Sequence, residues 1–285
     1  MTRLSKTILE ADVMSLVINT NVASLNAQRS LAASGSELKT AMERLSSGKQ
    51  INSAADDAAG FAIAERMTAQ IRGLNMAAKN ANDGISMLAT IENATNDITD
   101  MLHRMREIAV QAVNDTNGDQ DREYLDAEVQ DLKAEIDRVA TQTQYNGENV
   151  LDGSLSGAKI QVGTKASQSI TFSVADVGTT NLSIDGIDVL DGTNAASALT
   201  AIDAAIEQVA GDRADYGSLQ NRLEYTVSNL MNVAEYTTAA RSRIEDADFA
   251  VESARLAKAQ VLQQTGTAML AQANASQQLA LSLFR

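Results

Sequence analysis

Apolar and small residues recur in steps of four and three along most of this chain. The first such run falls at Leu31, Gly35, Leu38, Met42 and Leu45. Residues three and four apart lie on one face of an α-helix, so this spacing is typical of a coiled-coil seam. The pattern predicts a helix in this region that packs against another helix.

A second and much longer run predicts a helix from about residue 58 to residue 113. At roughly 1.5 Å per residue, such a helix is on the order of 80 Å long. A rod of that length needs long partners beside it to bury its apolar face. Its seam consists of Ile71, Leu74, Ala78, Ala81, Ile85, Leu88, Ile91, Thr95, Ile98, Leu102 and Met105.

The turn-forming cluster NDTNGD at 114–119 separates the long helix from a shorter one. We expect the shorter helix to run antiparallel to the long helix. Its seam consists of Leu125, Val129, Leu132, Ile136 and Val139.

The middle of the chain, at about 145–195, has Gly and Asp between short β-branched runs. Residues 160–162 and 170–174 are typical of the two strands of a hairpin. A second and weaker strand pair is expected at 182–184 and 187–190. The sequence thus predicts a small β-rich region here.

Helical periodicity then returns and continues to the end of the chain. One seam extends to about residue 240 and consists of Leu199, Ile202, Ile206, Val209, Tyr216, Leu223, Val227 and Leu230. The last seam consists of Leu262, Gly266, Met269, Ala273, Ser276, Ala280 and Leu283. The opposite face of this last helix is also apolar, and a helix without a charged face is usually buried all round.

These patterns predict a mainly α fold, with long α-helical coiled-coil rods from both chain ends and a small β-hairpin region in the middle. One partner helix cannot bury the last helix on every side. We therefore expect the two end helices to pair with each other and with copies of the same chain. The residues that we assign to this polymerisation are Leu31, Leu38, Leu45, Leu262, Met269, Leu270 and Leu283.

Composition and charge argue against two classes of partner, nucleic acids and membranes. The chain has no Pro and no Cys, and its net charge is −14. Residues 1–36 carry a net +1 and residues 253–285 a net +3, so the span between them carries −18. This acidic span argues against a nucleic-acid partner, which favours a basic face. The chain has no run of eighteen apolar residues, so we expect no membrane partner.

The stretch ERLSSGKQINSAADDAAG at 43–60 holds candidate chemistry between two predicted helices. A nucleotide loop needs GxxxxGK[ST], but Gln50 follows Gly48-Lys49 and Glu43 stands at the first glycine position. Asp56 and Asp57 lack further metal ligands at a recognisable spacing. We expect neither a metal nor a cofactor here.

We interpret the stretch as a joint between two helices. Ser53 and Asp56 match the capping-box pattern, and Asp57 then also lies in the first helical turn, where the helix dipole favours anions. Gly48 can end the preceding helix in a left-handed conformation.

A second joint is expected in RSRIEDADFA at 241–250. Ser242 and Glu245 again match a capping box. Arg241 and Arg243 bring positive charge, and we hypothesise that they lie near the two aspartates of the first joint.

Catalysis is not expected. His103 is the single histidine and sits among charged residues of the long helix. Nothing in the sequence positions a nucleophile beside a base.

Several of these stretches together resemble bacterial flagellin, the subunit of the flagellar filament. The matching segments are LVINTNVASLNAQRSL, ERLSSGKQINSAADDAAGFAIA, KNANDGIS, HRMREIAVQA, TQYNGENVLDG, SRIEDADFA and QVLQQTGTAMLAQAN, in the order found in that family. The resemblance covers about 15–175 and 195–285. It implies a self-assembling structural subunit of the extracellular filament, used for swimming motility, and no enzyme.

The resemblance also implies a domain plan. Residues 14–57 and 246–285 correspond to an inner coiled-coil domain, and 58–245 to an outer rod domain. The large variable outer domains of longer relatives are essentially missing. Residues 1–13 precede the usual start of the family, and we hypothesise that translation begins at Met14.

Partners follow from the resemblance as well. It implies export through the flagellar type III channel with an export chaperone, and contacts with cap and hook-junction proteins. It also implies recognition by Toll-like receptor five of the host. The positions that match the receptor-binding pattern are Arg104, Met105, Arg106, Glu107, Ile108 and Glu128.

Two rival interpretations stay open at this level. The hook–filament junction protein has similar ends, but the matches through the long rod favour the filament subunit. A cytoplasmic coiled-coil adaptor belongs to another class, and secretion into the medium distinguishes it.

Overall fold

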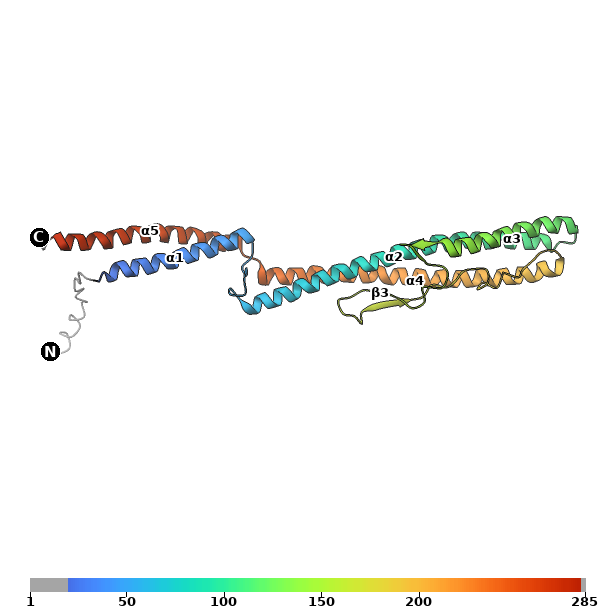
Figure 1. Ribbon diagram of the computed structural model, residues 1–285, viewed down its shortest axis with the longest axis horizontal. Helices are drawn as coiled ribbons and strands as arrows, with labels where there is room; N and C mark the ends of the chain where they lie inside the picture. Colours follow the sequence, from blue (N-terminus) through green and yellow to red (C-terminus); the bar gives the residue numbers. More distant parts are fainter. Residues whose placement is uncertain (1–19, 283–285) are drawn as a thin grey trace, which may run out of the picture. The chain divides into compact units, whose positions relative to one another are not determined.

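The computed structural model describes residues 20–282 and divides into two units. Unit 1 consists of the residues up to 66 together with those from 239 onward, and unit 2 consists of residues 67–238. The helices are α1 (Val22–Ser47), α2 (Ala58–Ala112), α3 (Asp119–Gln142), α4 (Gly192–Glu245) and α5 (Phe249–Ser282). The mainly helical fold that the hydrophobic pattern predicts is confirmed, and Figure 1 shows the helices.

Unit 1 is built on an antiparallel pair of helices, α1 and α5. The start of α1 meets the far part of α5, because Asn21 Nδ2 donates to the carbonyl of Ala273 at 3.0 Å. The end of α1 meets the beginning of α5, where Arg44 lies 3.2 Å from Glu252. Figure 1 shows the two helices side by side.

The seam of α1 is close to the predicted one but differs at one position. Leu31, Leu38 and Leu45 are half-buried, and Leu31 lies against Gly266 of α5. Met42, which was expected in the seam, is 56% exposed, and Ala41 is 2% exposed in its place. Successive residues of an α-helix point about 100° apart, so only one of these two neighbours can face the partner helix.

Unit 2 has one main apolar core in which α2, α3 and α4 take part. Leu88, Ile98 and Leu102 of α2 are almost completely buried, as are Ile136 of α3 and Ile202 of α4. The periodic residues that the sequence assigns to three long helices therefore meet in one place. The hydrophobic effect favours this arrangement, because the apolar face of each helix is removed from water only when the other two helices cover it.

The β-structure is smaller than the helices and forms two hairpins in the described residues. Strands β3 (Ala158–Gln161) and β4 (Ser169–Phe172) pair antiparallel with Ile160 opposite Ile170. They confirm the predicted hairpin, with strand ends shifted by about two residues. Ile160 and Ile170 face the core of unit 2.

The other hairpin, β1 (Gln144–Tyr145) with β2 (Glu148–Asn149), was not predicted as a separate element. Asn146 and Gly147 form its turn with φ values of 53° and 86°. An Asn-Gly pair with positive φ at both residues is the favoured two-residue hairpin turn, so this signal was available in the sequence.

The second predicted strand pair, at 182–184 and 187–190, is wrong. This stretch forms turns and irregular chain, although Leu182, Ile184 and Val189 are buried. Side chains of α3 bind its backbone in place of a strand: Asp126 accepts from the Val189 amide at 3.0 Å, and Lys133 donates to the Ile187 carbonyl at 3.3 Å.

Candidate functional site

The α1–α5 pair of unit 1 is the first candidate site, because much of its apolar surface is uncovered. Leu31 packs against Gly266, where an added Cβ would lie 3.3 Å from Leu31 Cδ1. Leu270 is half-buried. Two of the predicted polymerisation residues, Leu262 and Met269, are instead 42% and 64% exposed.

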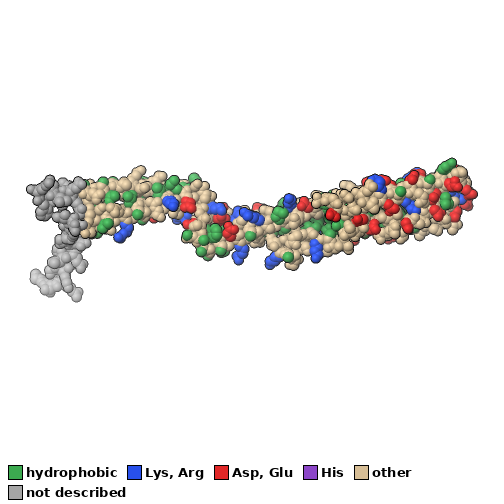
Figure 2. Space-filling view, viewed as in Figure 1, with side chains coloured by type: hydrophobic (Ala, Val, Ile, Leu, Met, Phe, Trp, Pro, Cys, Tyr) green, Lys and Arg blue, Asp and Glu red, His purple; other side chains and the backbone are tan. Residues whose placement is uncertain are grey.

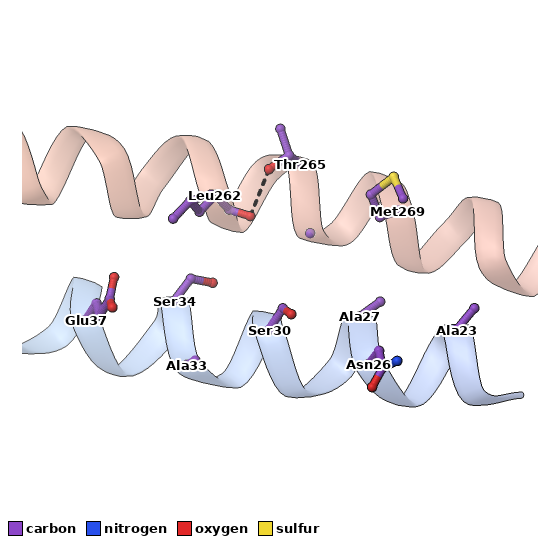
Figure 3. Close-up of a pocket in the computed structure, with 11 residues that line it drawn as sticks. Ala23, Asn26, Ala27, Ser30, Ala33, Ser34, Glu37, Leu262, Thr265 and Met269 are labelled. Carbon is purple, nitrogen blue, oxygen red and sulfur yellow. Dashed lines mark hydrogen bonds between the residues drawn. The ribbon is translucent and has the colours of Figure 1, made fainter. Parts of the chain in front are cut away.

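A groove runs between the two helices on one side of the pair (Figure 3). It is lined by small residues of α1, among them Ala27, Ser30 and Ser34, and by Leu262 and Met269 of α5. In Figure 3 the side chain of Ser34 points toward α5, and Ser34 is 5% exposed. Small side chains on one wall and long apolar ones on the other leave room for a further apolar side chain.

Further apolar side chains of unit 1 are exposed outside the groove. They are Val22, Leu25, Phe249, Val251 and Val261. Phe249 alone is 71% exposed. Exposed apolar surface of this kind marks a site of interaction with another protein. Leu283 and residues 1–13 lie outside the described residues.

The first joint lies directly against the second within unit 1. Gly48 ends α1 in the left-handed conformation, with φ of 71°. The Gln50 amide donates to the carbonyl of Glu245 at 2.7 Å, and the Ala247 amide donates to the carbonyl of Gly48 at 2.9 Å. The Lys49 ammonium also forms an ion pair with the Glu245 carboxylate.

The capping box expected at Ser53 is wrong in its placement. α2 begins at Ala58, and the Asp57 carboxylate accepts from the amides of Ala59 and Gly60, both at 3.0 Å. Asp57 is therefore the N-cap of α2. The helix therefore begins about one turn later than predicted, because the Asp56 side chain binds the amides of Asn52 and Ser53 in the preceding turn.

Asp56 closes the turn of the first joint. Its carboxylate accepts from the amide of Ser53 at 2.9 Å, from the amide of Asn52 at 3.1 Å and from the Ser53 hydroxyl. These bonds, above all the one from the Ser53 amide, lower the pKa of Asp56. The charge of Arg44 lowers it further.

The capping box expected at Ser242 is also wrong, because Ser242, Arg243 and Glu245 belong to the last turn of α4. Asp248 takes the cap role for α5, since its side chain accepts from the Ala250 amide at 2.9 Å. Arg241 lies 3.7 Å from Glu245 on the same helix. The hypothesis that Arg241 and Arg243 face Asp56 and Asp57 stays a prediction.

The second candidate site lies on the surface of unit 2. Arg104 on α2 donates from Nε to Glu128 on α3 at 2.8 Å and from Nη1 to Glu107 at 3.1 Å. These three side chains are between 43% and 69% exposed. The hydrogen bond to Glu128 raises the pKa of Arg104. Arg106 forms a separate ion pair with Asp203 on α4.

The other two residues of the receptor-like pattern are not on this surface. Met105 is fully buried and Ile108 is 1% exposed, both in the core of unit 2. On a helix, residues one position apart point in different directions, so adjacent members of HRMREI cannot share one face. The stretch HRMREI thus places Arg104 and Glu107 on the surface and Met105 and Ile108 in the core beneath it.

No group of three metal-ligating side chains comes together in the part of the chain that the structure describes. Over the same residues, no helix combines the length and hydropathy that crossing a bilayer requires. His103 lies on the exposed side of α2.

Comparisons with known proteins match both parts of the chain. The model of the bacterial flagellin N-terminal helical region matches residues 18–156, and that of the bacterial flagellin C-terminal helical region matches residues 199–284. Flagellin of Halalkalibacterium halodurans is 42% identical over 272 residues, which cover 95% of this chain and all of that protein.

The chain is also similar to a second curated protein and to a solved structure. The flagellar filament 33 kDa core protein of Treponema phagedenis is 41% identical over 290 residues, covering 95% of this chain and all of that protein. The crystal structure of Bacillus cereus flagellin is 34% identical, with a TM-score of 0.48 over 53% of this chain and 88% of that one.

Proposed function

Because this chain belongs to the bacterial flagellin family, we propose that its α1–α5 pair is the surface through which copies polymerise. The chain is a structural subunit of the extracellular flagellar filament, and it assembles with itself. The family is structural and not enzymatic. The hook–filament junction protein is not favoured, because flagellins match over nearly the whole chain.

The observation that carries the proposal is the exposed apolar surface of unit 1. Leu262 and Met269 line the groove between α1 and α5, while Leu31, Leu38 and Leu45 of α1 are half-buried. Complete burial of a fully exposed Leu or Met side chain contributes about 1.5–3 kcal/mol, and Leu262 and Met269, which are already partly covered, contribute a fraction of this when a neighbouring copy covers them. We assign Leu270 of α5, and Leu283 on the ground of the sequence pattern alone, to the same polymerisation surface.

The domain plan is part of this proposal. Residues 14–57 and 246–285 form the inner coiled-coil domain, and residues 58–245 form the outer rod domain. The joint residues Ser53, Asp56, Asp57, Arg241, Ser242, Arg243 and Glu245 connect the two layers. The backbone hydrogen bonds from Gln50 to Glu245 and from Ala247 to Gly48 support a joint at this place.

The test of the polymerisation surface replaces its exposed apolar groups by charge. Leu262→Glu combined with Met269→Glu is expected to abolish filament growth from purified monomer, as scored by electron microscopy, while the monomer keeps its helical circular dichroism. Ala89→Glu with Asn93→Glu, at exposed positions of α2, is the matched control and is expected to assemble. Normal filaments from the Leu262/Met269 variant would refute the assigned surface.

Partners of the monomer complete the proposed function. An export chaperone, the cap and the hook-junction proteins contact the chain before or during assembly. Each of these partners has to bind a chain whose terminal apolar residues are uncovered, and the exposed side chains of unit 1 offer that surface.

We also place recognition by Toll-like receptor five on the charged surface of unit 2. Arg104, Arg106, Glu107 and Glu128 supply exposed charge, and the buried Met105 and Ile108 support them from below. Arg104→Ala is expected to reduce the response of a receptor reporter cell to monomer. Lys165→Ala, an exposed charge on a different part of unit 2, is the control, and equal responses to both variants would contradict the assignment.

A further inference from the structure

One exposed methionine, Met269 of α5, lies on the proposed polymerisation surface. Its residue is 64% exposed and lines the groove between α1 and α5. Met231 of α4, in unit 2, is 58% exposed and lies outside that surface, in a hollow that Ile85 and Val227 also line. Met105 of α2, by contrast, is fully buried. The chain thus places the same type of side chain in three different settings.

The surroundings of Met269 are mainly apolar. Figure 2 shows apolar side chains, and few charged ones, over α1 and α5 on the face in view. In Figure 3 the sulfur of Met269 lies on the side of α5 that faces away from α1. The thioether is therefore open to small solutes in the monomer, and a neighbouring copy that packs on this surface covers it.

A thioether in this setting is open to oxidation by a peroxide. A lone pair of the sulfur attacks one oxygen of hydrogen peroxide, so that an S–O bond forms as the O–O bond breaks. The proton of the transferred oxygen moves to the departing hydroxide, which leaves as water. The sulfur loses two electrons and the peroxide gains them. The product is methionine sulfoxide, which is polar and chiral where methionine is apolar and flexible.

The groove offers little to a sulfoxide oxygen, which needs a hydrogen-bond donor when it is buried. The Ser34 hydroxyl already donates to the carbonyl of Leu31 at 3.1 Å. The Thr265 hydroxyl already donates to the carbonyl of Val261 at 2.9 Å. Covering an oxidised Met269 with a neighbouring copy therefore costs free energy that covering the unoxidised side chain does not.

We propose that Met269 is a site of oxidative modification at which a peroxide decides whether a subunit can polymerise. This inference rests on the polymerisation surface assigned above and adds its regulation. Oxidation acts on the monomer, whose thioether is open, and spares the subunit whose thioether a neighbour covers. The change is reversible, because methionine sulfoxide reductases restore the thioether.

The first measurement compares monomer and filament of the full chain after brief exposure to hydrogen peroxide. Mass spectrometry of peptides detects the mass gain of one oxygen atom at each methionine. We expect Met269 to be oxidised in the monomer and protected in the filament, while the buried Met105 stays unoxidised in both.

The second measurement follows growth of unoxidised filament seeds with peroxide-treated monomer. Treatment is expected to raise the monomer concentration at which the unaltered chain grows by about tenfold or more, because an unpaired polar group has to be buried. Reduction by methionine sulfoxide reductase should restore growth. Met269→Leu keeps an apolar side chain without a thioether and should grow equally well before and after treatment. Met231→Leu is the matched control and should stay as sensitive to peroxide as the unaltered chain.

A second pair of variants needs no oxidant. Met269→Gln places a polar side chain of similar length at this position and is expected to assemble poorly, whereas Met231→Gln should assemble normally. This pair, together with the reductase treatment of the unaltered chain, decides the question even where Met269→Leu itself grows slowly.

Three results would overturn the inference alone: normal growth of monomer whose Met269 is fully oxidised, equal loss of growth in treated Met269→Leu and unaltered chains, or equal assembly of the two glutamine variants. Equal oxidation of Met269 in monomer and filament would instead overturn the assigned polymerisation surface, and this inference with it.

Discussion

Arg44 on α1 and Glu252 on α5 are 208 residues apart in the sequence, yet Arg44 Nη1 lies 3.2 Å from Glu252 Oε1. The Glu252 side chain is only 5% exposed, and Arg255 also donates to it at 2.8 Å. This buried carboxylate, shared by two arginines, fixes where the two end helices of unit 1 meet.

Removing this carboxylate should loosen the helix pair. Glu252→Ala leaves Arg44 partly buried without its partner, which we expect to cost about 2–4 kcal/mol. The measurement is amide hydrogen exchange of α1 in the monomer, in which protection should fall. Glu37→Ala, an exposed position on α1, is the control and should leave exchange unchanged. Equal protection in both variants would show that the ion pair contributes nothing.

Two glycines of unit 1 should respond in opposite ways to alanine. Gly35 has no atom within 4 Å of an added Cβ, so Gly35→Ala is expected to stabilise the helix pair by about 0.5–1 kcal/mol through helix propensity. At Gly266 the new Cβ would meet Leu31 at 3.3 Å, so Gly266→Ala should gain less or destabilise. Thermal unfolding of both monomers compares them, and an equal gain at both positions would contradict the close contact.

The first joint should depend on pH through Asp56. The pKa of Asp56 is lowered in the folded chain, so its bonds contribute above the ordinary pKa of 3.8 and are lost as pH falls through the lower folded pKa. We expect the carboxyl resonance of Asp56, followed by nuclear magnetic resonance, to titrate below pH 3.8. Ser53→Ala removes only the hydroxyl bond and should raise this pKa slightly. A titration at 3.8 or above would refute the bonding described.

Asp57→Ala tests the cap of α2 by a different measurement. Loss of an N-cap carboxylate typically costs about 1 kcal/mol, so the first turn of α2 should fray. Faster hydrogen exchange of the Ala59 and Gly60 amides is the expected result. Ser53→Ala, at the position that the capping-box pattern wrongly favours, should leave these two amides protected.

Tyr216 of unit 2 should titrate late. Burial raises the pKa of Tyr216 to about 12; its bond from the Ala175 amide acts in the opposite direction, and Asp212 and Asp215 raise the pKa further. A raised pKa means that the stability it contributes is complete below pH 10 and is lost as pH rises toward 12. The difference between the tyrosinate absorbance of the unaltered chain and that of Tyr216→Phe should show a midpoint at about 12. A midpoint near 10 would mean that this hydroxyl is not buried.

The periodic pattern identified the helices well because their seams are long. α2 was expected over 58–113 and spans Ala58–Ala112. Each such seam repeats the same signal over many turns, so a local exception such as Met42 does not hide it. The caps were harder to place, since Asp56 and Asp57 both suit a cap, and only the folded turn decides which carboxylate reaches the helix amides.

The sequence by itself determined the helical composition, the β3–β4 hairpin, the apolar character of both ends and the family. Only the tertiary structure decided which seam residues stay uncovered. Leu262 and Met269 belong to the predicted seam but remain exposed, because one partner helix covers only one side of α5. The tertiary structure also decided that Met105 and Ile108 are buried while Arg104 is exposed, because side chains that are neighbours in the sequence point in different directions from a helix.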